Sequence, residues 1–215
     1  MPKIIESVVS WGFQAFTPDR AWEPPSPLFD HHGQPKNMKE LDRYTLVAII
    51  LHWIMAPVIL MQFSLGWYMV DLPKSPERSY LFALHKSIGL TIFLLAMIRL
   101  GWRLIRSSPP LPATLPHWQR KSARFTHTML YILMFLQPLS GYLSASFSGY
   151  TTNLFGIPLP AWGWKDPTLN QLFTDFHIIS SIILVLLIIA HILGALVHVL
   201  TPGDHMFRRM WPWFK

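Results

Sequence analysis

Residues 173–200 read FTDFHIISSIILVLLIIAHILGALVHVL. The run is almost continuously apolar and exceeds the roughly 20 residues that a helix needs to cross a bilayer. It shows no period of two, so a helix and not a barrel strand is the spanning form. Three other stretches share these properties, and we place the four spans near residues 46–70, 80–101, 125–147 and 172–200. The sequence therefore predicts an all-α membrane protein, a four-transmembrane-helix bundle.

The composition agrees with a membrane protein. Of the 215 residues, 51% are hydrophobic and 13% are charged, against roughly 25% charged in soluble domains. The net charge is +7, but the basic residues border apolar runs and form no stripe, so we expect no nucleic-acid partner. The chain has no cysteine, which excludes disulfides, thiolate zinc sites, iron–sulfur clusters and covalently attached c-type haem. A cofactor would have to be held by other side chains, and the chain has ten histidines.

The distribution of Lys and Arg predicts the orientation. The N-terminal segment, the second loop and the C-terminus, with the adjoining helix ends, hold fourteen of the 18 basic residues. The first and third loops hold only Lys74, Arg78, Lys86 and Lys165. By the positive-inside rule both termini are cytoplasmic.

We divide the chain into an N-terminal cytoplasmic or interfacial extension (1–45), a membrane domain (46–202) and a cytoplasmic tail (203–215). The extension lacks a signal-peptide core, so we expect no cleavage. One stripe at helical spacing consists of Ile5, Val8, Val9, Phe13 and Phe16. It predicts a short amphipathic helix, either on the inner membrane surface or against a partner subunit. The sequence leaves both open.

Five histidines lie inside or near the ends of the spans: His52, His85, His127, His177 and His191. With the predicted orientation, His52 and His191 lie toward the inner face, and His85 and His177 toward the outer face. His191 follows His177 by 14 residues, which is about 21 Å along a helix. Ionisable side chains in a span are costly and usually functional. Depth therefore predicts two stacked pairs, although each histidine taken singly is equally compatible with a structural role.

Helical phase supports the same pairs. Fourteen residues return to within about 40° of the starting face, so His177 and His191 point into the same side of the bundle. The interval also separates His52 from Gly66, His85 from Arg99 and His127 from Gly141. We expect both glycines at the outer site, where a flat cofactor needs close approach, and Arg99 at the inner site. Glycines that only pack helices are the alternative.

Two facing imidazoles favour haem over zinc. Zinc takes four ligands, and neither pair has a nearby Cys, Asp or Glu. Haem iron needs only two axial ligands because the porphyrin supplies four, so the pairs predict two b-type haems. With both axial positions filled, the expected chemistry is electron transfer. The residues expected to bind the haem propionates are Lys86, Arg99, Arg103 and His127; for the arginines, the positive-inside signal is an equal alternative.

The chain resembles the bacterial cytochrome b561 family of four-span di-haem proteins. The stretches that carry the resemblance are LHW (51–53), LHKSIG (84–89), IRLGWRL (98–104), THTMLYILMFLQPLSGYL (126–143), FH (176–177), HILGALVHVL (191–200) and DHMFRRM (204–210). It covers about residues 42–212, and the N-terminal segment departs from the short start usual in the family.

The resemblance implies haem iron ligation by His52, His85, His177 and His191, and a bacterial inner-membrane location. It also implies electron transfer between an outer-face donor, superoxide in some members, and ubiquinone. His198, and more weakly Trp53, would then contact the quinone near the inner haem; a helix-end histidine facing headgroups is the alternative. The outer basic residues are balanced by Asp71, Glu77, Asp166 and Asp175, which weakens electrostatic capture of superoxide.

Two other functions stay open. The chain could be the b-type cytochrome subunit of a dehydrogenase or another respiratory complex, docked through the N-terminal extension. It could also be a non-redox four-span subunit whose histidines bind metal or only pack.

Overall fold

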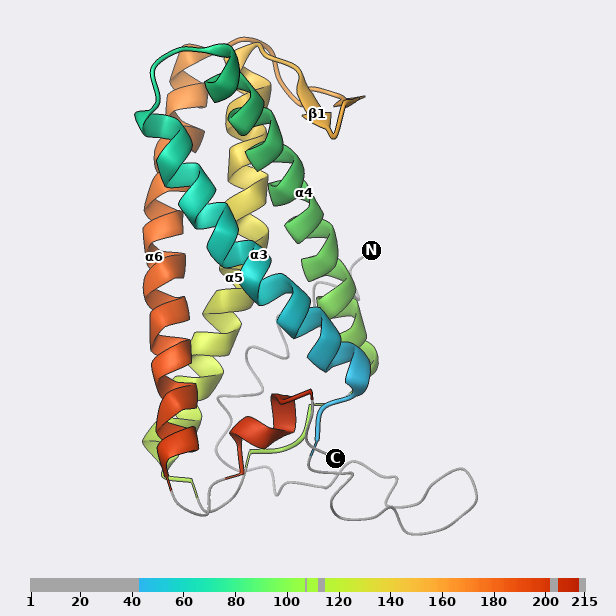
Figure 1. The fold of residues 1–215 in the computed structure, drawn as a ribbon, viewed down its shortest axis with the longest axis vertical. Coiled ribbons are helices and arrows are strands. Elements are labelled where there is room, and N and C mark those ends of the chain that lie inside the picture. The colour runs from blue at the N-terminus through green and yellow to red at the C-terminus, as the bar shows by residue number, and fades with distance from the viewer. Residues whose placement is uncertain (1–42, 107, 112–114, 202–204, 213–215) are drawn as a thin grey trace. The chain divides into compact units, whose positions relative to one another are not determined.

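A computed structural model describes residues 43–106, 108–111, 115–201 and 205–212. Within these ranges four long helices follow one another up and down: α3 (Leu46–Asp71), α4 (Pro76–Ile105), α5 (His117–Ser148) and α6 (Pro167–Leu200) (Figure 1). Each is long and apolar enough to cross a membrane. The predicted four-helix membrane bundle is confirmed. The predicted amphipathic stripe lies outside the described residues.

Three helices begin before the predicted spans, at residues 76, 117 and 167 instead of 80, 125 and 172. Two of these starts are capped. Ser75 accepts a hydrogen bond from the Arg78 amide, and Asp166 accepts from the amides of Thr168 and Leu169. Each cap is followed by a proline, which suits the first helical turn. An apolar run marks the part of a helix that meets lipid, whereas polar caps extend the helix beyond it.

The α5–α6 connection contains a β-hairpin that the sequence did not predict. Strand β1 (Thr152–Leu154) pairs antiparallel with β2 (Ile157–Leu159). Gly149 ends α5 with a left-handed φ of 82°, and Phe155 (48°) and Gly156 (93°) make the turn. Strands of three residues are too short to show an alternating pattern.

The bundle has two different ends. We call the end with the hairpin and the α3–α4 connection the hairpin end, at the top of Figure 1, and the end with residues 43–45 and 205–212 the terminal end. At the terminal end the short 3-10 helix η2 (Phe207–Met210) lies against the start of α3. There Trp53 Nε1 donates to Met210 O (2.7 Å), and Arg43 donates to Trp211 O (2.7 Å).

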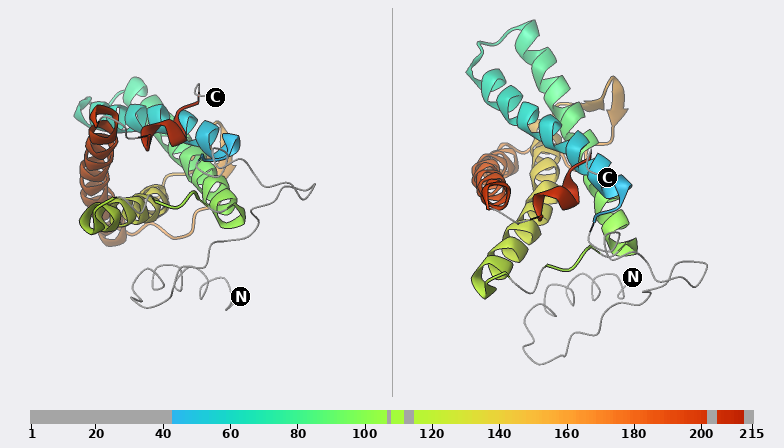
Figure 2. Two further views of the ribbon diagram at one scale, coloured as in Figure 1. Left: turned by 90° about the horizontal axis from the view of Figure 1, so that it is seen from below. Right: turned by 60° about the horizontal axis from the view of Figure 1, so that its bottom comes forward.

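Polar contacts and a small apolar core join the helices, which are seen end-on in Figure 2. Ser144 and Thr174 hydroxyls lie 2.7 Å apart between α5 and α6. Such small polar contacts are typical of membrane helix pairs. Met55, Ile92 and Ala96 form the buried core among α3, α4 and α5. Many apolar side chains of α6 are exposed instead, as expected for a helix surface that faces lipid.

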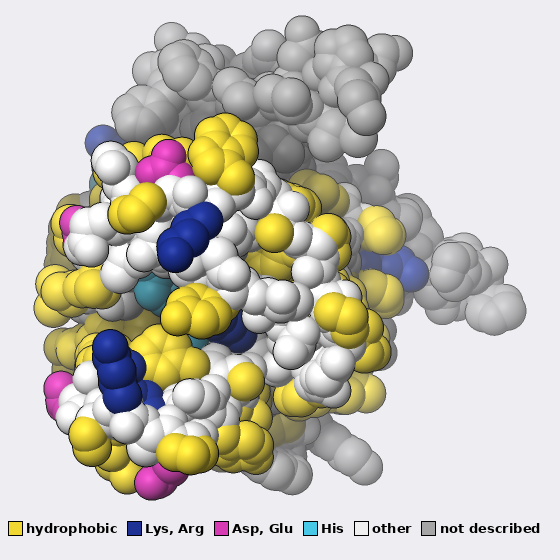
Figure 3. All heavy atoms as spheres, turned by 90° about the horizontal axis from the view of Figure 1, so that it is seen from above, with side chains coloured by type: hydrophobic (Ala, Val, Ile, Leu, Met, Phe, Trp, Pro, Cys, Tyr) yellow, Lys and Arg dark blue, Asp and Glu magenta, His cyan; other side chains and the backbone are white. Residues whose placement is uncertain are grey.

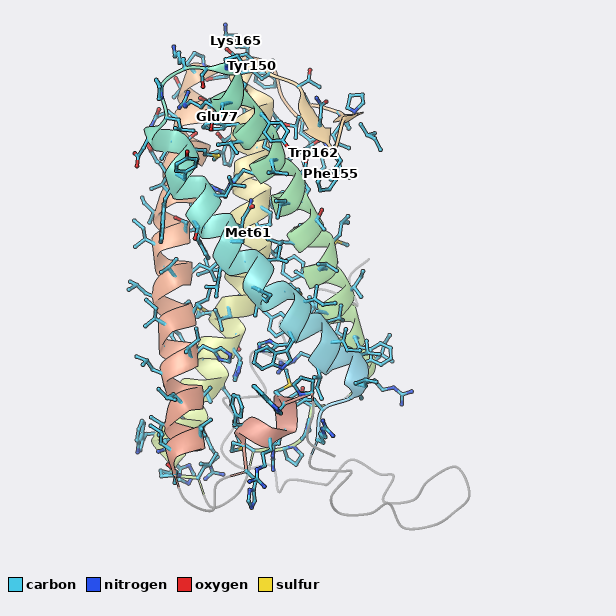
Figure 4. The ribbon with its side chains drawn as sticks, in the orientation of Figure 1. Met61, Glu77, Tyr150, Phe155, Trp162 and Lys165 are labelled. Atoms are coloured by element: carbon cyan, nitrogen blue, oxygen red, sulfur yellow. The ribbon has the colours of Figure 1, made fainter. Side chains whose placement is uncertain are left out.

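Ser87 connects the β-hairpin to α4 by hydrogen bonds. Its hydroxyl lies 2.9 Å from Ala83 O of its own helix and 3.1 Å from Asn153 O, so its one proton is shared between these acceptors, and it accepts from the Phe155 amide (3.0 Å). Its side chain is buried, whereas Tyr150, Phe155 and Trp162 are exposed around the hairpin (Figure 4). A single hydroxyl therefore holds both sides of the turn.

We expect Ser87→Ala to loosen the hairpin, because it leaves the Asn153 carbonyl and the Phe155 amide without this partner. The loss should be about 1–3 kcal/mol, seen as a lower Tm in detergent and as faster proteolysis between residues 149 and 166. Ser64→Ala is the control, because the exposed Ser64 hydroxyl bonds only Leu60 O of its own helix. Equal proteolysis of the two variants would contradict the role of Ser87.

Candidate functional site

Toward the terminal end, α3 and α6 bring two histidines together. The ring centres of His52 and His191 lie 6.1 Å apart, with an angle of 77° between the ring planes. His127 of α5 also reaches this level, and its ring centre is 5.2 Å from that of His191. We call His52 and His191 the terminal pair.

Toward the other end, α4 and α6 bring together the second pair. The ring centres of His85 and His177 lie 6.2 Å apart, with an angle of 79° between the planes. We call these two residues the hairpin pair. The four histidines thus meet in the two combinations that depth and helical phase predict.

The ring separations fit one metal ion between two imidazoles. A metal–imidazole bond is about 2.0 Å long, and the ring centre lies roughly 1 Å beyond the nitrogen. Two imidazoles on opposite sides of one ion therefore have centres about 6 Å apart. Among the described residues, no group of three or more His, Asp or Glu side chains is placed to hold a metal. Either pair would thus need the remaining ligands from a group such as a porphyrin.

The backbone of α6 stands apart from those of α3 and α4. Within the described part of the chain, α6 packs closely on α5 but makes hardly any close backbone contact with α3 or α4. The imidazoles of each pair therefore meet across helices that stand apart. A flat ligand between the rings requires this arrangement.

Two glycines allow the rings of the hairpin pair to lie close to the helices. A Cβ at Gly66 would be 3.1 Å from His85 Cε1, and one at Gly141 would be 2.9 Å from His177 Cε1. A side chain at Gly141 would therefore displace the ring. The glycines that were expected beside a flat cofactor stand against the imidazoles themselves.

Hydrogen bonds define the tautomer of His177. Its Nδ1 lies 2.8 Å from Gln137 O. A carbonyl oxygen only accepts, so Nδ1 carries the proton and donates it. The lone pair is then on Nε2, which is the nitrogen a metal requires.

The predicted cations divide between the two levels. Arg99 donates to Ala48 O (2.8 Å), one turn before His52, so it lies at the level of the terminal pair. Arg103, one turn further along α4, stacks on the Tyr131 ring (5.2 Å to its centre). Lys86 follows His85 on α4 and is half-buried.

The two residues expected at the quinone lie toward the terminal end. The Trp53 ring packs edge-on against both His52 (5.6 Å) and Trp211 (5.3 Å). His198 is half-buried near the end of α6, two turns beyond His191.

Sequence reasoning missed two glutamines that contact the hairpin pair. Gln62 Nε2 donates to His85 O (2.6 Å), and Gln137 Nε2 donates to His177 O (3.0 Å). Each glutamine precedes a site glycine by four residues, Gly66 or Gly141. This repeated four-residue spacing is the feature of the sequence from which the glutamines could have been predicted.

Comparisons with known proteins identify the family of the chain. A model of the prokaryotic cytochrome b561 family matches residues 43–213. The chain is 32% identical to cytochrome b561 homolog 2 of Escherichia coli, over 79% of this chain and 91% of that protein. It is 27% identical to cytochrome b561 homolog 1 of the same organism, over 80% and 98%. It is 24% identical to cytochrome b562 of Cereibacter sphaeroides, over 78% and 94%.

The family match covers the four long helices and their connections. Membership implies b-type haem and electron transfer, and the four membrane-length helices make the chain a multi-pass membrane protein. The chain belongs to the prokaryotic cytochrome b561 family.

Proposed function

We propose that this cytochrome carries electrons from a donor at the hairpin end to ubiquinone at the terminal end, through two b-type haems. The observation that carries the proposal is the pair of histidine contacts, with ring centres 6.1 and 6.2 Å apart. The α6 members of the two pairs are 14 residues apart, which is about 21 Å of helix. Two stacked sites of this kind divide the membrane crossing into short electron-transfer steps.

When bound, haem iron supplies a one-electron redox couple. His52 with His191, and His85 with His177, would fill both axial positions and so keep other ligands away from the metal. Near the middle of the bundle, Met55, Ile92 and Ala96 form an apolar core that excludes water. The protein residues thus favour electron transfer over chemistry at an open coordination site.

Basic side chains would hold the haem propionates. Arg99 donates to Ala48 O, one turn before His52, and so lies at the level of the terminal pair. Arg103 and His127 are near that level. Lys86 would serve the hairpin pair, since it is the next residue after His85. A guanidinium or ammonium group stabilises a carboxylate most where water is scarce.

Ubiquinone would bind at the terminal end. Trp53 supplies a flat ring beside His52, which suits a quinone ring. His198 would donate a hydrogen bond to a quinone oxygen from two turns beyond His191 on α6.

Superoxide is the first candidate for the donor. Each of two superoxide ions would lose one electron to become oxygen, and ubiquinone would take up two electrons and two protons. In the end-on view of the hairpin end, Lys and Arg side chains lie around a hollow with histidine visible deep within it (Figure 3). Positive charge beside a hollow raises the local concentration of an anion, although nearby acidic residues reduce the effect. The chain would thus act as a superoxide:ubiquinone oxidoreductase.

For this role the hairpin end must face outward and both termini must be cytoplasmic, in the bacterial inner membrane. The support is the distribution of basic residues along the sequence, since the N-terminal segment, the second loop and the C-terminus hold fourteen and the first and third loops hold four.

A second candidate function is the b-type cytochrome subunit of a dehydrogenase or another respiratory complex. The observation that favours it is the start of the family match at residue 43. The preceding 42 residues are additional to the matched domain and offer a docking segment for a partner.

Removal of one histidine should remove one haem. We expect His85→Ala and His177→Ala each to lose the haem of the hairpin pair and to keep the other, because each change removes one of its two axial ligands. Haem content per chain and the α band of the reduced-minus-oxidised spectrum measure the loss. His117→Ala, at the exposed start of α5, is the control and should keep both haems. Loss of the terminal-pair spectrum would contradict the pairing.

Superoxide should reduce the protein directly. We expect stopped-flow mixing of the oxidised cytochrome with superoxide to produce the reduced α band, and His85→Ala to slow this step because it removes the haem closest to the donor. Absence of any reduction in a protein that contains both haems would leave the partner-subunit function.

His198→Ala should separate haem binding from quinone reduction. We expect both haems to be retained and turnover with a soluble ubiquinone analogue to fall by about tenfold, since one hydrogen bond to a substrate is worth about 1.4 kcal/mol. His117→Ala again serves as the control. Unchanged turnover would exclude His198 from the quinone site.

A further inference from the structure

Two helix hairpins, α3–α4 and α5–α6, present the same three residues to the hairpin pair. In each, a glutamine amide on the first helix donates to the backbone carbonyl of the histidine on the second, His85 or His177. In each, a glycine four residues later stands against the ring of that histidine. The two halves of the site are therefore built alike, and their differences can be compared position by position.

The half around His177 is rich in hydrogen bonds. His177 Nδ1 donates to Gln137 O (2.8 Å), and Ser140 Oγ lies 3.2 Å from the same nitrogen. The Ser140 hydroxyl also donates to Gln137 O (2.8 Å), and Ser180 Oγ donates to Gln137 Oε1. Both serines are only 3% exposed. These residues hold the imidazole and the glutamine in one network.

The half around His85 lacks these hydroxyls. The residue before Gly66 is Leu65, where the other half has Ser140, and the residue three after His85 is Ile88, where the other half has Ser180. His85 Nδ1 and Gln62 Oε1 are buried and have no hydrogen-bond partner among the residues that the structure describes. In the other half, the atom equivalent to His85 Nδ1 bonds to the Gln137 carbonyl and lies beside Ser140 Oγ. The atom equivalent to Gln62 Oε1 accepts a hydrogen bond from Ser180.

A hydrogen bond to the second nitrogen of a metal-bound imidazole fixes its tautomer and orientation and raises its basicity. A more basic axial ligand stabilises ferric over ferrous iron and lowers the reduction potential. His177 Nδ1 has such bonds, whereas His85 Nδ1 has none within the described part of the chain. The two imidazoles would therefore act on one iron with unequal strength.

We propose that Gln137, Ser140 and Ser180 are positioning residues that act through His177. They orient its ring, keep its proton on Nδ1, and so make His177 the stronger axial donor and set a lower potential for the haem of the hairpin pair. This inference rests on the proposed haem ligation by that pair, and it assigns these three residues a role beyond helix packing.

The test is a potentiometric titration of the purified two-haem protein, with the two waves assigned from the His85→Ala variant. We expect Ser140→Ala and the Ser140→Ala, Ser180→Ala double variant to move the hairpin-pair wave to a more positive potential, while the terminal-pair wave stays in place. The ferric EPR spectrum, which reports the angle between the two ring planes, should change for that haem alone. Ser140→Thr keeps the hydroxyl and should restore the original potential.

Ser181→Ala is the matched control. Ser181 is adjacent to Ser180 on α6, and its exposed hydroxyl bonds only Ile178 O. We expect no change in either wave. An equal shift in this variant would mean that the potential follows general loosening of α6, and would overturn the proposal.

Leu65→Ser tests the inference in the opposite direction, without removing any native bond. It places a hydroxyl at the counterpart of Ser140, on the residue before Gly66, which stands against the His85 ring. We expect the hairpin-pair wave to move to a more negative potential. If this variant retains both haems and neither wave moves, the proposal is overturned even if Ser140→Ala fails to fold. If wild-type protein binds no haem at the hairpin pair, the proposed function fails instead.

Discussion

A histidine ring inside a bilayer has no bulk water to bond, so its nitrogens depend on partners within the protein or a bound group. α6 carries two such rings, 14 residues apart. α3 and α4 each bring a second ring opposite one of them, with ring centres 6.1 and 6.2 Å apart. At the hairpin pair, Gly66 and Gly141 make room for the rings. The backbone carbonyl of Gln137 accepts a hydrogen bond from His177 Nδ1–H, so the proton stays on Nδ1 and the lone pair is on Nε2.

The spans and the histidine pairs could be predicted because a bilayer imposes simple rules on a sequence. An apolar run must reach a set length, and two residues 14 apart share a face at known depths. The β-hairpin and the C-terminal segment follow no such rule. Their positions depend on single contacts such as Ser87 with Asn153 O, and Trp53 with Met210 O. Backbone acceptors of this kind leave no pattern in the sequence.

The likeness between α3–α4 and α5–α6 left only a weak pattern in the sequence. It consists of one glutamine, one glycine and one histidine in each half, set among unrelated apolar residues. Apolar residues exchange freely where they face lipid, so only the residues that touch the rings need to match. Their matched contacts, Gln62 with His85 O and Gln137 with His177 O, became recognisable once the helices were placed.

The β-hairpin and the C-terminal segment are each bonded to a side chain close to a site histidine. Ser87, which holds the β-hairpin, follows His85 by two residues. Trp53, which holds the C-terminal segment through Met210 O, follows His52 directly. Each end of the bundle therefore carries a segment outside the four long helices that is anchored beside a site histidine.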